Sequence, residues 1–317
     1  MSIQRVKNVW KYVLPTMLSS VCMFLFTIVD GIFVGRGVGT DALGAVNIAF
    51  PAVMVVNALY MLTTIGGVTV VAIRLGRGDD KGANQVFMHS VIFTFAIGVV
   101  FTLLGTLFSR QICVLLGAND TFLELASDYL FWYTVFTIPA GLTVCFQGFC
   151  RNDGSPGLSS FAVVCAAFCN IFLDWLFIFP LQMQTAGAAI ATGISQAISM
   201  LIVLSHFLRK KGKLRVYFPK LEIALFRKII LRGLPESIAQ FAMPVMTICL
   251  NLVLADKIGD TGINAFSVMV YVSTFAVEIF FGTSGGLQPL FGQSYGAKEE
   301  TDLKFYYRIG LIINVVG

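Results

Sequence analysis

The chain consists largely of apolar runs, each long enough to cross a lipid bilayer. A bilayer core about 30 Å thick needs about 20 helical residues at 1.5 Å rise per residue. The runs predict spans at 12–35, 43–73, 84–108, 122–149, 158–180, 187–208, 234–256 and 263–293, with a ninth beginning near 304. Since 57% of the residues are hydrophobic and only 12% are charged, we predict an all-α integral membrane protein.

The apolar residues fill both odd and even positions of each run, which favours helices over the alternating strands of a membrane barrel. The first run is longer than the core of a cleavable signal peptide, so we expect it to remain in place. Lys304 to Gly317 is too short to span, and we therefore expect the chain to stop inside a helix. The seven cysteines show no metal-ligand spacing and are interpreted as packing residues: Cys22, Cys113, Cys145, Cys150, Cys165, Cys169 and Cys249.

Basic residues gather on one side of the predicted membrane. With the N-terminus inside, the cytoplasmic segments hold nineteen of the twenty-two Lys and Arg residues, and only Arg36, Arg110 and Lys257 fall on the other side. Cytoplasmic loops normally carry this excess. We therefore expect a multi-pass protein of the plasma membrane with a cytoplasmic N-terminus. The net charge of +5 then reflects topology and contact with the lipid bilayer, and we expect no nucleic acid partner.

The longest basic segment, 209–232, mixes cations with apolar residues such as Leu225 and Ile229. Two interpretations stay open from the sequence. The segment is either an interfacial helix that links two parts of the protein or a solvated loop that fixes topology.

The chain contains an internal repeat at an offset of 220 residues. Leu14-Pro15 aligns with Leu234-Pro235 without a gap, and LGRGDD (75–80) lies over YGAKEE (295–300). Further matches include Gly66 and Gly76, which fall on Gly286 and Gly296. Six spans precede the second copy, so both copies have the same orientation and form a parallel repeat.

The repeat predicts a two-lobed helical bundle. Residues 1–208 form an N-terminal six-helix lobe, 209–233 a basic cytoplasmic linker, and 234–317 an incomplete C-terminal lobe. Parallel six-helix repeats give twelve spans when complete, of which this chain contains about eight and a half.

Three acidic residues lie well inside predicted spans: Asp30, Asp174 and Glu278. An ionisable group in the bilayer core costs about 2.5–3.5 kcal/mol even on a lenient scale, so such residues usually face a cavity and handle ions or substrate. Asn170 precedes Asp174 by four residues and shares its helix face. Burial disfavours the charged form of a carboxyl group, and two acids in one cavity titrate as a pair. The alternative is a polar residue that only sets helix packing.

Four local stretches, in order and spacing, resemble the multidrug and toxic compound extrusion (MATE) family: VDGIFVGRGVGTDALGA (29–45), RLGRGDDKGA (74–83), QGFCRNDGSP (147–156) and GLQPLFGQSYGA (286–297). The family's superfamily also contains lipid-linked oligosaccharide flippases. The resemblance implies a twelve-helix, two-lobed antiporter that exports bulky, often cationic drugs in exchange for protons or sodium by alternating access. It needs no cofactor beyond the coupling ion, and we expect a monomer.

The resemblance also implies roles for particular residues. Asp30, Asn170, Asp174 and Thr192 match the N-lobe cation site of one prokaryotic branch of the family, where Na⁺ could bind at Asp30, Asn170 and Asp174 in place of a proton. For Glu278 we favour attraction of cationic substrate in the C-terminal lobe, with a second protonation site as the alternative.

Two other functions have less support from the sequence. A flippase for lipid-linked saccharides must neutralise pyrophosphate, and the predicted spans contain no Lys or Arg to do so. An intramembrane enzyme using Asp30 and Asp174 as an acid/base pair lacks any supporting HExxH, GxSxG or GxGD motif. No Walker A motif is present either, so ATP-driven transport would need another subunit.

Overall fold

The computed structural model describes residues 3–257 and 260–316, and these are almost entirely helical, without a strand among them. The helices are α1 (Ile3–Gly37), α2 (Thr40–Gly76), α3 (Asp80–Leu115), α4 (Asp120–Val135), α5 (Thr137–Asn152), α6 (Pro156–Ile178), α7 (Gln184–Leu208), α8 (Ile223–Lys257), α9 (Asp260–Ala297) and α10 (Glu300–Val316). The predicted all-α class is confirmed. The side chain of Cys249 lies outside the described residues. The six described cysteines are unpaired.

Long apolar helices are the main elements of this bundle. Among the described residues, five helices are long and apolar enough to span a membrane, and the bent pair α4–α5 counts as a sixth. These helices are α1, residues 44–76 of α2, α3, α6 and α7. The twelve-span architecture of a complete protein stays a prediction.

The predicted span 122–149 is two helices rather than one. α4 and α5 meet at Phe136 with a bend of 52°. Pro139 in the first turn of α5 has no N–H to donate to the carbonyl of Val135, and its ring crowds that carbonyl. Thr137 Oγ1 bonds the Thr134 carbonyl at 2.7 Å, and Tyr60 Oη donates to the Thr137 carbonyl at 2.7 Å. The break therefore has its own polar partners inside the bundle.

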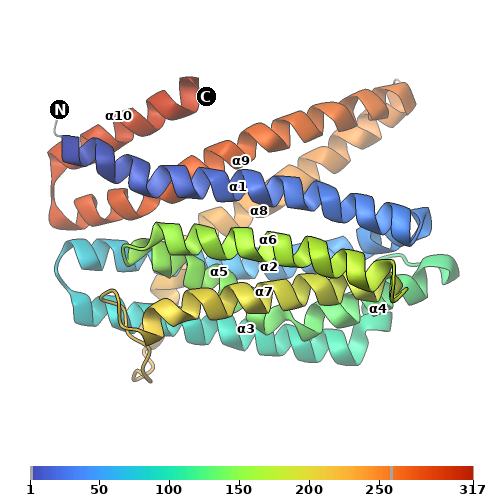
Figure 1. Cartoon of the computed structure of the whole chain (residues 1–317), viewed down its shortest axis with the longest axis horizontal. Helices are drawn as coiled ribbons and strands as arrows, with labels where there is room; N and C mark the ends of the chain where they lie inside the picture. The colour runs from blue at the N-terminus through green and yellow to red at the C-terminus, as the bar shows by residue number, and fades with distance from the viewer. Residues whose placement is uncertain (1–2, 258–259, 317) are drawn as a thin grey trace.

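One end of the bundle carries most of the basic residues, and we call it the basic end. It contains the start of α1, the α2–α3 and α5–α6 turns, the segment 209–222 and the α9–α10 turn, all on the left in Figure 1. At the opposite end, the last turns of α8 and the first turns of α9 diverge from the end of α1 (Figure 1).

Glycines bring helices of the two predicted lobes into close contact toward the basic end. A Cβ atom at Gly76 would overlap the carbonyl oxygen of Gln293, and one at Gly296 would overlap that of Ile73. The two contacts are equivalent in the repeat, because position 76 corresponds to 296 and position 73 to 293 at the 220-residue offset. Gly66 packs in the same way on α8 at Ile229. Such backbone approach is typical of small residues between membrane helices.

The segment between α7 and α8 is neither a helix throughout nor simply a solvated loop. Residues 209–222 are not helical, whereas α8 begins at Ile223, eleven residues before the predicted seventh span. Leu214 is fully buried, and Leu225 and Ile229 of α8 pack into the same core cluster as Phe87 and other residues of α3, α5 and α7. The first turns of α8 are thus anchored in the N-terminal half of the chain.

Candidate functional site

A buried polar cluster lies where α1, α6 and α7 meet. Asn170 and Asp174 occupy one face of α6 and are 1% and 0% exposed. Thr192 of α7 faces Asn170, and Asp30 of α1 faces Asp174. The structure therefore brings all four predicted cation-site residues together. Their role in coupling stays a prediction.

The amide of Asn170 joins two of these helices. When its oxygen faces α7, it accepts from the Thr192 backbone N–H at 3.0 Å and from Thr192 Oγ1 at 3.2 Å. Its NH₂ group then donates to Asp174 Oδ2 at 2.6 Å. The opposite orientation would place the amide oxygen against a carboxyl oxygen, so we assign this one. The position of the Asp174 carboxyl is thus fixed from both α6 and α7.

The carboxyl groups of Asp30 and Asp174 are close neighbours. Two ionised carboxylates accept hydrogen bonds but have none to donate, so their close approach is favourable only with a proton or a cation between them. One further oxygen of each group, Oδ1, is buried and has no hydrogen-bond partner among the described residues. A buried acceptor without a partner is unfavourable, and a proton or a small cation is what such oxygens can bind.

A small cavity of about 10 Å³ adjoins Asn170 and Thr192. A volume of about 10–15 Å³ is the minimum for one water molecule. Its lining includes Gln196 and Ser195 on α7 and Met23 on α1. The site can therefore admit a water or an ion but no organic molecule in this conformation.

Two tyrosines of α4 belong to this region and were missed from the sequence. Tyr129 lies close enough to interact electrostatically with both Asp30 and Asp174. Its ring stacks on Tyr133 with centroids 6.2 Å apart, and Tyr133 lies near Asn57 of α2. The only sequence pattern that could have indicated them is the four-residue spacing of two tyrosines on an apolar helix. It does not reveal which neighbouring helix the pair faces.

Glu278 lies apart from this cluster. On α9, Phe275 contacts Phe24 with ring centroids 5.4 Å apart, and Gly282 lies directly against Met17. Glu278 therefore lies beside the part of α1 between Met17 and Phe24. Phe24 is six residues from Asp30, so Glu278 is at least about 9 Å from Asp30 along the helix axis. It is partly buried, and no hydrogen bond or ion pair joins its carboxyl to another described residue. It can thus act on a ligand independently of the Asp30–Asp174 pair.

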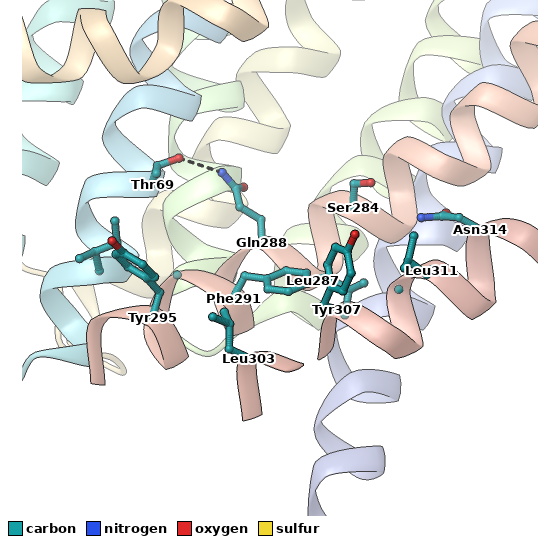
Figure 2. A pocket seen from close by; sticks show the side chains of 13 residues that line it. Thr69, Ser284, Leu287, Gln288, Phe291, Tyr295, Leu303, Tyr307, Leu311 and Asn314 are labelled. Carbon is teal, nitrogen blue, oxygen red and sulfur yellow. Dashed lines mark hydrogen bonds between the residues drawn. The ribbon is translucent and has the colours of Figure 1, made fainter. Parts of the chain in front are cut away.

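A larger cavity lies elsewhere again, between α2, α9 and α10 (Figure 2). It has a volume of about 540 Å³ and is lined by apolar, aromatic and neutral polar side chains, without a charged residue. Gln288 of α9 donates to Thr69 of α2 at 3.4 Å across its edge (Figure 2). Its size suits an organic molecule. Nothing in its lining selects for positive charge.

A multi-pass helical bundle with a buried acidic pair between its helices is typical of an ion-handling membrane transport protein. The comparison with protein families agrees. The MatE family model matches residues 15–176 and 235–316, and the chain belongs to the MatE family. The two matched segments begin 220 residues apart (235 minus 15), which is the offset of the internal repeat. MATE family multidrug transporters are secondary transporters and not enzymes.

Curated relatives include the multidrug export protein MepA. The chain is 28% identical over 294 residues to MepA of Staphylococcus haemolyticus, covering 91% of this chain and 64% of the relative. For MepA of one Staphylococcus aureus strain the identity is 25%, with 91% and 64% covered. The chain thus spans about two thirds of the length of these relatives.

Solved MATE structures have the same fold. A MATE in complex with MaD3S superposes with a TM-score of 0.92 at 25% identity, covering 98% of this chain and 70% of that one. An outward-facing multidrug resistance MATE transporter gives 0.92 at 25% identity, with 98% and 69% covered.

Proposed function

We propose that this chain belongs to a cation-coupled antiporter that exports bulky, often cationic organic compounds. The observation that carries the proposal is the contact between Asp30 and Asp174, with Asn170 and Thr192 fixing the second carboxyl. Two neighbouring acidic groups between membrane helices are suited to take up and release a proton. The relatives named multidrug export proteins supply the substrate class.

Alternating access would link this site to transport. The close glycine contacts toward the basic end and the diverging helices at the other end (Figure 1) support an outward-facing conformation. A proton entering from outside would neutralise the pair and weaken its hold on an organic cation. Return to the inward-facing state would release the proton, and each charge moved across 100 mV contributes about 2.3 kcal/mol.

Glu278 would act as a separate attraction site for substrate. Its carboxyl is partly buried and unpaired among the described residues, so an organic cation could approach without displacing a protein partner. The two described cavities contain no Lys or Arg in their linings, which disfavours a pyrophosphate-binding flippase. We further propose a monomer in the plasma membrane with the N-terminus in the cytoplasm. We propose H⁺ as the coupling ion, because a single proton between two neighbouring carboxyl groups lets one donate to the other.

The test combines substrate binding with proton release. Ethidium binding to the purified chain is followed by fluorescence in weakly buffered solution containing a pH indicator, so both events are recorded together. We expect wild-type protein to release protons on binding, and Asp30→Asn and Asp174→Asn to abolish that release. Asp128→Asn, at an exposed site on α4, is the matched control. Unchanged proton release in both cluster variants would defeat the coupling assignment.

Dye efflux from cells distinguishes the coupling ion. Efflux that stops with a proton uncoupler and persists without sodium supports H⁺. Efflux that depends on a sodium gradient and survives the uncoupler contradicts it.

A further inference from the structure

Four cations gather where the end of α2 meets the start of α8. Arg74 and Arg77 close α2, and Lys228 and Arg232 lie on the second and third turns of α8. Partial burial, followed by the charges of Arg74, Arg77 and Arg232, lowers the pKa of Lys228 from its ordinary value. The Lys228 side chain is therefore close enough to the other three to be repelled by them.

Little negative charge offsets this cluster within the described residues. Arg74 donates to the Gly82 carbonyl at 2.7 Å, and its Nε lies 3.9 Å from a carboxyl oxygen of the half-exposed Asp79. The side chains of Arg77, Lys228 and Arg232 are exposed and make no ion pair or hydrogen bond with another described residue. Like charges in this arrangement are unfavourable unless an anion lies among them.

The membrane-facing surface of α8 leads directly to this cluster. Leu231, Leu234 and Ile238 are 59%, 41% and 60% exposed and form one stripe at helical spacing. Exposed apolar residues in line on a spanning helix face lipid. The next position on the stripe toward the basic end is Arg227, and the start of the helix beyond it, Ile223, is 86% exposed. A change from apolar to cationic side chains along a lipid-facing stripe marks the headgroup level.

The internal repeat shows that helix packing does not require these charges. α9 packs on α1 through Gly286 as α2 packs on α8 through Gly66. At the 220-residue offset, the four cations correspond to neutral residues, which are Ser294, Ala297, Asn8 and Tyr12. A close helix contact therefore forms at the equivalent place in the other copy with no cation at the four corresponding positions.

We propose that Arg74, Arg77, Lys228 and Arg232 bind the phosphate of an anionic phospholipid headgroup, while its acyl chains lie along the exposed stripe of α8. Arginine and lysine at the membrane surface are the side chains that recognise such headgroups. Because the site has two residues on α2 and two on α8, the bound lipid bridges them and stabilises the close contact of Gly66 with Ile229. This inference is independent of the coupling role of Asp30 and Asp174.

The test measures binding of phosphatidylglycerol to the detergent-solubilised chain by native mass spectrometry, with phosphatidylcholine as the neutral lipid. We expect at least tenfold tighter binding of phosphatidylglycerol to the wild type. The double variant Lys228→Gln/Arg232→Gln should weaken it by about fivefold per charge removed, since one basic residue contributes about 1 kcal/mol near an anionic surface. Lys228→Arg should retain binding.

The matched control is Lys7→Gln/Lys11→Gln, which removes two exposed charges from the corresponding stretch of α1. It should leave phosphatidylglycerol binding unchanged. Equal loss in this control would show diffuse attraction and overturn the site. Equal affinity of the wild type for the two lipids would also overturn it, and this comparison needs no folded variant. Displacement of the lipid by millimolar inorganic phosphate would assign the cluster to a free anion and contradict the lipid.

Discussion

The carboxylate of Asp153 and the imidazole of His206 form a buried pair, with His206 Nε2 and Asp153 Oδ2 2.9 Å apart. Their side chains are 2% and 1% exposed. Asp153 also accepts from the backbone N–H groups of Lys213 at 2.6 Å and Leu214 at 3.2 Å. A single carboxylate at the end of α5 thus anchors both the last turn of α7 and the segment that leads to α8.

Replacing Asp153 with alanine should destabilise this anchor strongly. Removing one partner of a buried pair typically costs about 3–5 kcal/mol, because the other groups lose their partner without regaining water. We expect a lower midpoint of thermal unfolding in detergent and faster trypsin cleavage after Lys211 and Lys213. Asp128→Ala, at an exposed position, is the control. Equal melting temperatures and cleavage rates for the two variants would show that Asp153 does not anchor the segment 209–222.

Adding a methyl group at the paired glycines should destabilise the contact between α2 and α9. A Cβ at Gly76 or Gly296 would overlap a backbone carbonyl of the facing helix, and overpacking of this kind costs about 1–3 kcal/mol. Gly76→Ala and Gly296→Ala should therefore lower the thermal midpoint. Gly285→Ala in the same α9 is the matched control, because a Cβ there meets nothing within 4 Å. It should be neutral or stabilising, since alanine is the better helix former. Equal thermal midpoints for all three variants would show that the contact between α2 and α9 is not close-packed.

Part of the site followed from spacing alone. Four residues separate Asn170 from Asp174, which places both on one helix face whatever surrounds it, and both are buried there. No spacing could show that Asp30, 144 residues earlier in the chain (174 minus 30), contacts Asp174. That pairing depends on how α1 packs on α6, and only the family resemblance indicated it.

Other features depended on tertiary contacts that composition does not encode. The apolar run 122–149 is continuous, yet the chain bends at Phe136, where Pro139 has no N–H to donate to the Val135 carbonyl and Tyr60 donates to the carbonyl of Thr137. The basic composition of 209–232 indicated a surface segment, but Leu214 and Ile229 are buried. Their apolar side chains could be assigned to the core only once the positions of α3 and α7 were known.

The hydroxyl of Thr192 should matter through its bond to Asn170. Its Oγ1 lies 3.2 Å from the Asn170 amide, and losing one such hydrogen bond costs about 0.5–1.5 kcal/mol. Thr192→Val keeps the shape and removes the hydroxyl, so ethidium-induced proton release should fall. Thr192→Ser keeps the hydroxyl and should preserve most of it. The hydrogen bond is irrelevant to coupling if serine and valine give the same loss.

Neutralising Glu278 should weaken the binding of cationic compounds selectively. A unit charge about 8 Å away at an effective dielectric constant of about 20 contributes about 2 kcal/mol, which is between tenfold and a hundredfold in affinity. We therefore expect Glu278→Gln to bind ethidium at least tenfold more weakly, while an uncharged dye of similar size binds as before. Glu278→Asp keeps the charge and serves as the matched control. Equal weakening for the charged and the uncharged dye would mean that Glu278 shapes the cavity rather than attracts charge. The fluorescence titration is made on purified protein, so the result does not depend on whether Asp30 and Asp174 couple transport to protons.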